Sequence, residues 1–312
     1  MQRHGDGIRR VVEDACSAVA LVHVAIEDQH AVDPAAGQQV MADHRQVIED
    51  AKAGRVIVMG VVGAAREVAG QAVLQRLFGR EDRAADRAHG APRQGFVPRQ
   101  AEAPLVFAAE QALQHGLACH LAGGTHHAHY DYPAGFCIFN DLAVISHYLL
   151  ASVRVNRVLI FDCDVHQGDG TARILHDTPD AITVSLHCEK NFPARKAESD
   201  WDIPLPMGMG DADYLKVVDD ALNYLLPLYQ PDLVLYDAGV DVHKDDALGY
   251  LKLTDEGVAA RDESVMRHCL GRDIPVVGVI GGGYSKDRPA LARRHGILHH
   301  SAQRVWTSSG CH

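Results

Sequence analysis

From residue 104 onward, short apolar runs rich in β-branched residues alternate with longer amphipathic stretches. The runs predict strands at Leu117–Ala122, Arg157–Phe161, Ile182–Leu186, Leu233–Tyr236 and Pro275–Ile280. The stretches beside them predict helices at Pro104–His115, Asp141–Ala151, Ala212–Leu226, Thr254–Leu270 and Pro289–His300. Strands that alternate with helices form βα units, and strands without polar alternation are covered on both faces. The sequence therefore predicts an α/β fold around a mostly parallel central sheet.

The bulk composition excludes several classes of protein. The chain has 312 residues, of which 47% are hydrophobic, so it can bury a full core. It contains no run of about 18 apolar residues that could span a membrane, and its first ten residues lack the apolar middle of a secretory signal. Its net charge of −11 argues against nucleic acid as a direct ligand. Its seven cysteines form no CxxC pair, which favours reduced thiols and a cytoplasmic location.

Residues 1–103 differ from the rest of the chain. The first 100 residues contain no Tyr, Trp, Asn or Thr, whereas the remainder carries all nine tyrosines and both tryptophans. A stretch at residues 54–78 predicts a strand, a glycine turn and a helix, but its glycines do not form the GxGxxG of a dinucleotide site. We divide the chain into an atypical segment at 1–103 and a regular α/β domain at 104–312. The segment is a small domain, a flexible extension, a divergent start of the fold or the product of a misread frame.

Polar residues follow each predicted strand of the regular half. The segments are "GGTHH" after the first run, then "DCDVHQGDG", "HCEKNFP", "DAGVD" and "GGGY". Open α/β sheets build their sites at the carboxyl ends of their strands. We therefore expect these five segments to converge on one crevice.

The segment "DCDVHQGDG" indicates a metal site. Residues at i, i+2 and i+4 of a strand face the same way, so Asp162, Asp164 and His166 are expected on one side. Crowded like charges are costly unless a cation neutralises them, and carboxylate and imidazole are ligands of divalent metals. Asp241 at the end of "DAGVD" is a candidate third ligand. The alternative is that these aspartates, Asp169 above all, cap the helix that follows.

Two further segments carry groups suited to proton transfer. The doublet His126-His127 follows a Gly-Gly turn, and imidazole can take a proton from water and return it to a leaving amine. The alternative is a pair of surface histidines in a chain that has 20. Tyr284 follows three glycines and could donate its hydroxyl to a developing oxyanion.

Four segments together resemble the zinc-dependent histone deacetylases of the arginase/deacetylase fold. They are "GGTHHAHYDYPAGFCIFNDLAV", "VLIFDCDVHQGDGT", "PDLVLYDAGVDVHKDDALGYLKLT" and "GGGYS", and the resemblance covers about residues 104–302. The spacing within "DAGVDVHKDDALGYLKLTDEGVAARDE" is most similar to the class IV branch and its bacterial relatives. The resemblance implies a three-layer α/β/α fold and hydrolysis of an acyl-amide, with acylated lysine as the substrate and partner.

The resemblance also implies roles for particular residues. One Zn²⁺ per chain would be held by Asp164, His166 and Asp241. The catalytic groups would be the general base His127, its electrostatic partner His126, the orienting carboxylates of Asp162 and Asp169, and the oxyanion donor Tyr284. The substrate channel would be lined by Gly135, Phe136, Phe192 and Gly282. A K⁺ ion would lie at Asp162, Asp164, His166, Ser185 and Leu186.

Several functional alternatives stay open at this stage. A ureohydrolase of the same general fold would need a second metal cluster, for which "DAGVD" offers only Asp237 and Asp241. A hydrolase of acetylpolyamines or other small acyl-amides would use the same catalytic groups. A non-catalytic scaffold would bind acylated lysine without turnover. The acyl-chain length, the natural substrate and the oligomeric state are not fixed by the sequence.

Overall fold

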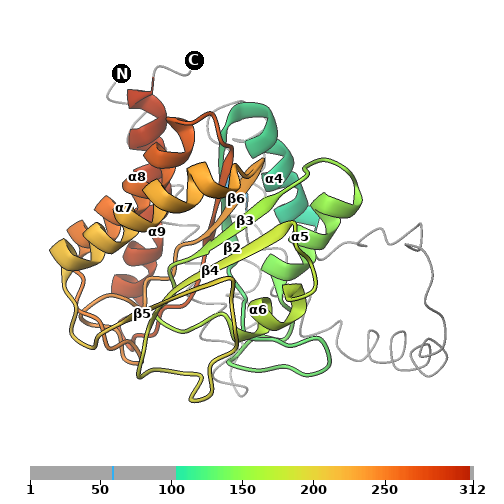
Figure 1. Ribbon diagram of the computed structural model, residues 1–312. Coiled ribbons are helices and arrows are strands. Elements are labelled where there is room, and N and C mark those ends of the chain that lie inside the picture. Colours follow the sequence, from blue (N-terminus) through green and yellow to red (C-terminus); the bar gives the residue numbers. More distant parts are fainter. Residues whose placement is uncertain (1–57, 60–102, 310–312) are drawn as a thin grey trace, which may run out of the picture.

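The computed structural model describes residues 58–59 and 103–309, and the described part is a parallel sheet between two layers of helices (Figure 1). The strands are β1 (Val58–Met59), β2 (Leu117–Gly123), β3 (Val158–Asp162), β4 (Ala181–Cys188), β5 (Trp201–Leu205), β6 (Leu233–Asp237) and β7 (Val276–Ile280). The helices are α4 (Ala103–His115), α5 (Asp141–Ala151), α6 (Asp169–Leu175), α7 (Asp211–Tyr229), α8 (Asp255–Leu270) and α9 (Arg288–Ser308).

The strands lie in the order β1-β2-β7-β6-β3-β4-β5, and every neighbouring pair is parallel. Strand β3 therefore lies inside the sheet, with β6 on one side and β4 on the other. Its last residue, Asp162, is in register with Asp237 of β6 and Ser185 of β4. This order brings the ends of β3 and β6 together, although β4 and β5 lie between these two strands in the sequence.

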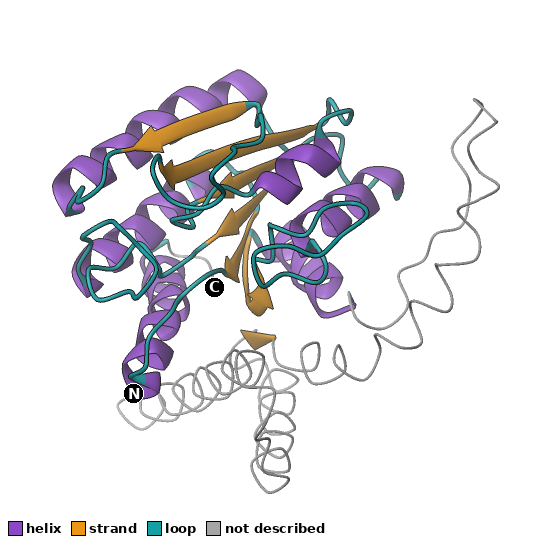
Figure 2. Ribbon diagram, turned by 90° about the horizontal axis from the view of Figure 1, so that it is seen from below, coloured by secondary structure: helices purple, strands orange, loops and turns teal. Residues whose placement is uncertain are grey.

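Alternate residues of each central strand pack into two separate hydrophobic cores. Leu159 and Phe161 of β3 face the core formed with α7, α8 and α9. Val158 and Ile160 face the core formed with α4, α5 and α6. Figure 2 shows the two helical layers on opposite sides of the sheet. The predicted three-layer α/β/α fold with a parallel sheet is confirmed, and it presents the carboxyl ends of its strands as one edge.

The predicted strands and helices of the regular half agree closely with those observed. Helix α9 continues to Ser308, eight residues beyond the predicted end at His300. Two elements were not predicted: the seven-residue helix α6 and the edge strand β5, which contains Pro204 and is partly or fully buried only at alternate positions. Edge strands tolerate proline and lack the continuous apolar run that reveals a central strand.

Only a small part of the N-terminal segment is described. Val58–Met59 pairs with Cys119 and His120 of β2, and it lies within the stretch at 54–78 for which a strand, a turn and a helix are predicted. The remainder of that stretch lies outside the described residues, and the division of the chain at residue 103 stays a prediction. Among the described residues, no helix combines the length and apolar character required to cross a bilayer.

Candidate active site and metal centre

The polar segments that follow β2, β3, β6 and β7 meet at the carboxyl edge of the sheet. Parallel strands place these ends side by side, which is why segments far apart in the sequence converge. Two groups of potential metal ligands form there among the described residues. One group is Asp164, His166 and Asp241, and the other is His126, Asp162 and Asp237.

The first group is compact and buried. His166 Nδ1 lies 3.1 Å from Asp164 Oδ1 and 3.1 Å from Asp241 Oδ2. Ligand atoms about 2.0 Å from a tetrahedral metal are about 3.3 Å apart, so these spacings suit a divalent cation. Two carboxylates and one imidazole leave a fourth position for water or substrate. The donor set therefore fits a metal ion.

Backbone N–H groups fix the two carboxylates of this group. Asp164 Oδ1 accepts from His166 N and its Oδ2 accepts from Gly282 N, at 2.9 and 2.7 Å. Asp241 Oδ1 accepts from Val165 N at 2.9 Å. The alternative that Asp164 caps the following helix is wrong, because its oxygens bind these groups instead. Strand β3 ends at Asp162, so a turn rather than strand alternation brings Asp164 and His166 together.

The charges within the first group need a positive partner. Burial and the charge of Asp164 raise the pKa of Asp241 to about 8. Burial opposes protonation of His166, but its hydrogen bonds to Asp164 and Asp241 raise its pKa to about 10. Without a metal the group thus holds protons near neutral pH. A cation that replaces those protons would relieve the same crowding of negative charge.

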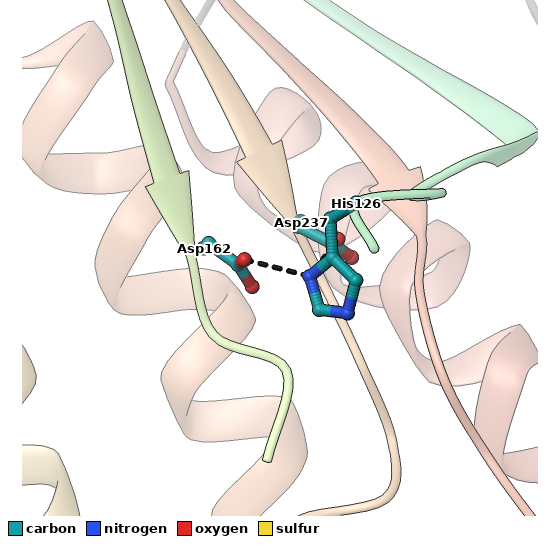
Figure 3. Close-up of side chains that lie close together, drawn as sticks. All are labelled: His126, Asp162 and Asp237. Atoms are coloured by element: carbon teal, nitrogen blue, oxygen red, sulfur yellow. Dashed lines mark hydrogen bonds and ion pairs between the residues drawn. The ribbon is translucent and has the colours of Figure 1, made fainter. Parts of the chain in front are cut away.

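The two histidines are buried, each with 3% of its surface exposed, so the alternative of surface histidines is wrong. His126 Nδ1 lies 2.7 Å from Asp162 Oδ2, and Figure 3 shows this contact with Asp237 close by. His127 Nδ1 lies 2.7 Å from Asp169 Oδ1. The two Nε2 atoms are 3.2 Å apart. Each imidazole is therefore oriented by its own carboxylate, and Asp169 serves this contact rather than a helix cap.

The surroundings drive the two imidazole pKa values apart. Burial lowers the pKa of His126, but Asp162 and Asp164 outweigh it and hold that pKa well above its usual value. Burial and the positive charge of His126 lower the pKa of His127 to about 4. At neutral pH these opposite shifts favour a protonated His126 beside a neutral His127. A pair of titratable groups separated in this way is typical of acid–base sites.

The first group, Asp164, His166 and Asp241, is called the metal group below. Aromatic rings surround it on its outer side. The Phe192 ring lies 4.9 Å from that of His127 at 85°, and the Tyr284 ring lies 6.0 Å from that of His166. Phe136 lies 5.9 Å from Tyr284 and is 67% exposed, and Phe192 is 44% exposed. These side chains can contact an apolar chain that approaches the metal group from solvent.

Two of the predicted channel glycines lie against the polar groups themselves. A Cβ on Gly135, whose φ is +53°, would lie 2.2 Å from the His127 ring. A Cβ on Gly282 would lie 2.2 Å from Asp241 Oδ2 and 2.5 Å from Asp164 Oδ2. Gly282 therefore adjoins the metal group. Its small size allows the chain to pass there.

The residues predicted for potassium are also close together in the fold. Asp162 and Ser185 are register partners on β3 and β4, and Leu186 is the next residue of β4. All are buried.

The second donor group was not anticipated. Asp237 is fully buried, and neither of its carboxylate oxygens has a hydrogen-bond partner among the described residues. Its Oδ2 lies 3.8 Å from His126 Nδ1. From the sequence, "DAGVD" offered only Asp237 and Asp241 for a second metal cluster. In the structure, His126 and Asp162 join Asp237 to form this second donor group.

Two further residues support the site and were not identified from sequence. His129 Nε2 lies 3.0 Å from Asp169 Oδ2, on the oxygen that His127 leaves free. Arg261 of α8 is fully buried and donates to the carbonyls of Gly239 and Cys163, which lie beside the metal group. The charged run "ARDE" in the predicted helix was the sequence signal for Arg261. It does not indicate burial, because charged residues of helices are commonly exposed.

Comparison with known proteins gives a consistent result. A family model described as "Histone deacetylase domain" matches residues 29–297. An uncharacterized protein of Picosynechococcus is 49% identical over 201 residues, which are 64% of this chain and 67% of the relative. Histone deacetylase 2 of Arabidopsis thaliana is 34% identical over 58% of this chain and 48% of its own. A probable deacetylase of Methanothermobacter thermautotrophicus is 32% identical over 65% and 63%. The chain thus spans about half to two thirds of the length of these relatives.

Proposed function

The chain belongs to the histone deacetylase family, whose members are amide hydrolases, and from that premise we propose that it removes acyl groups from acylated lysine with a zinc ion and water. One observation carries this proposal. A buried two-carboxylate, one-imidazole group adjoins two histidines whose pKa values are shifted in opposite directions by their surroundings. The proposed reaction adds water across the amide C–N bond and releases a carboxylate and the lysine amine.

Asp164, His166 and Asp241 would hold one zinc ion per chain. When bound, zinc would polarise the amide carbonyl and lower the pKa of water towards 7. The family resemblance also implies a potassium ion, which we propose at Asp162, Asp164, His166, Ser185 and Leu186. The buried and free cysteines of the described residues are in keeping with a reducing cytoplasm as its compartment.

His127 is the proposed general base. Its Nδ1 is engaged with Asp169, which leaves Nε2 as the atom that accepts the proton from the attacking water. The same atom can return that proton to the amine nitrogen when the C–N bond breaks. His126, held as a cation by Asp162, would keep His127 neutral before the reaction and stabilise the negative charge that develops.

Tyr284 and the aromatic side chains would bind the rest of the substrate. Burial and the charge of Asp164 raise the pKa of Tyr284, so its hydroxyl keeps its proton and can donate to the oxyanion. Phe136 and Phe192 would contact the aliphatic stem of an acylated lysine. An extended, uncharged chain fits between such rings better than a charged amine.

The test joins metal content to turnover. The purified full chain is assayed with fluorogenic acetyl- and long-acyl-lysine peptides and with acetylpolyamines, before and after zinc chelation, and its bound metal is measured. We expect about one zinc per chain and acyl-lysine hydrolysis that chelation abolishes. Tyr284→Phe should lower kcat by about 10²-fold or more, whereas Tyr224→Phe, an exposed tyrosine of α7, should not.

Other outcomes would contradict the proposal in different ways. Zinc without turnover of any substrate would favour a binding scaffold. Two bound metals with no acyl-lysine hydrolysis would favour the ureohydrolase alternative, since the donor group of His126, Asp162 and Asp237 would then hold the second ion. Turnover of acetylpolyamines alone would move the substrate to small acyl-amines.

A further inference from the structure

The backbone of Tyr284 is bound on both sides by two consecutive residues of another loop. Its N–H donates to Asp246 Oδ2 at 2.6 Å. Its carbonyl accepts from Ala247 N at 2.9 Å. Asp246 lies 38 positions before Tyr284 in the sequence, and the two contacts hold both peptide groups of the residue that carries the proposed oxyanion donor.

Asp246 also closes the turn that follows Asp241. Its Oδ1 accepts from Leu248 N and from Gly249 N, each at 2.8 Å. Gly249 packs so closely on Asp241 that a Cβ would lie 1.8 Å from the Asp241 carbonyl oxygen. One carboxylate therefore links the backbone next to a candidate metal ligand with the backbone of Tyr284. A carboxylate that only shaped the local turn would need no contact with Tyr284.

The preceding part of the Tyr284 loop is held by different groups. Gly282 N donates to Asp164 Oδ2, and Val240 N donates to the Gly282 carbonyl. These bonds fix the loop beside the metal group but lie two residues before the tyrosine. The position of the phenol relative to the metal group thus depends on the contacts that Asp246 and Ala247 make.

We propose that Asp246 is a positioning residue for catalysis, which holds Tyr284 at the distance where its hydroxyl meets the developing oxyanion. This inference rests on the proposed function of the site. The hydroxyl interacts with the transition state more than with the bound substrate, so misplacing it lowers kcat and leaves KM nearly unchanged. A displacement of about 1 Å at a catalytic group can lower the rate about 10²-fold.

Asp246→Asn is the substitution that isolates this contact. Three N–H groups converge on the two oxygens of Asp246, and an asparagine offers one oxygen and one NH₂. The variant keeps the side-chain shape and can still close the turn, but an NH₂ would then face the Tyr284 N–H. Asp245→Asn is the matched control, because the neighbouring carboxylate is exposed and contacts Arg294 at 3.1 Å.

The experiment compares the full-length wild type, Asp246→Asn, Asp245→Asn, Tyr284→Phe and the double variant of Asp246→Asn with Tyr284→Phe. We expect Asp246→Asn to lower kcat by about 10- to 100-fold, with KM within about threefold and zinc content unchanged. The kcat of the double variant should lie within about twofold of that of Tyr284→Phe alone, because both changes remove the same interaction. Asp245→Asn should behave as the wild type.

Three results would overturn the proposal. The first is an unchanged kcat in Asp246→Asn. The second is a double variant whose fold-loss in kcat equals the product of the two single losses. The third is a loss of zinc from Asp246→Asn. The last would place the effect on the metal group rather than on the tyrosine. Should Asp246→Asn fail to fold, Asp246→Ser replaces it, since the shorter side chain cannot bridge to Tyr284.

A second readout does not depend on activity. Hydrogen exchange of the peptide that contains residues 281–287 reports the Tyr284 amide directly. We expect about tenfold faster exchange in Asp246→Asn and none of this increase in Asp245→Asn. If the wild type turns over no substrate, the proposed function fails, and hydrogen exchange alone then tests whether Asp246 holds Tyr284. Equal exchange in both variants would refute this contact. Faster exchange in Asp246→Asn would support it.

Discussion

Arg261 offers the sharpest test of how the fold supports the site. Its side chain is fully buried, and its Nε and Nη2 donate to Asp262 Oδ1 at 3.0 and 2.9 Å. Its Nη1 donates to the carbonyls of Gly239 and Cys163 at 2.7 and 3.3 Å. Tyr236 completes the group through a hydroxyl that donates to Asp262. A helix of one layer thereby holds the ends of β3 and β6 together.

Replacing Arg261 with methionine leaves the Asp262 carboxylate buried without its cation. Breaking a buried ion pair by removing one partner costs about 3–5 kcal/mol. Two carbonyls also lose a donor, at about 1 kcal/mol each in isolation. Because these losses share one side chain they do not add fully, and we expect the free energy of unfolding to fall by about 4 kcal/mol.

The measurement is urea unfolding followed by circular dichroism, with and without a zinc chelator, so that metal binding does not enter the comparison. Arg267→Met is the matched control on the same helix, since Arg267 is exposed and its contact with Glu263 is 3.4 Å long. That change should cost less than about 1 kcal/mol. A loss below about 1 kcal/mol for Arg261→Met, or equal losses for both variants, would refute the argument.

Three further predictions concern the site and the core. His127→Ala should lower kcat by about 10²- to 10⁴-fold and leave bound zinc unchanged, as measured by turnover and metal analysis; a parallel loss of zinc would contradict its role as the base. Burial lowers the pKa of His299 to about 4, so the unfolded chain binds more protons between pH 6.5 and 4 and stability falls as the pH drops through this range. His299→Gln should make that fall shallower by up to about 1.4 kcal/mol per pH unit in urea unfolding. Gly282→Ala would place a Cβ 2.2 Å from Asp241 Oδ2 and should weaken zinc binding in a chelator competition, whereas Gly210→Ala, with open space around it, should not.

The sequence anticipated the regular half of the fold because its signals are local. Strand β3 is a continuous apolar run, and such a run is buried wherever the sheet places it. Strand β5 was not predicted, because this edge strand is shielded from solvent only at alternate positions and so lacks a continuous apolar run. The candidate site was largely anticipated by the residues that follow each strand, but Asp237 and Arg261 were not, because their importance depends on what lies next to them.

The sequence by itself determined the alternation of strands and helices, the faces that each strand buries, and the chemical groups at each strand end. These properties follow from residue order over a few positions. Only the tertiary structure decided that Asp241 lies 3.1 Å from His166, 75 positions away, and that Asp246 binds Tyr284. It also decided that the pKa values of the two adjacent histidines shift in opposite directions. The physical reason is that strand order sets distances between remote residues, and burial sets the cost of each charge.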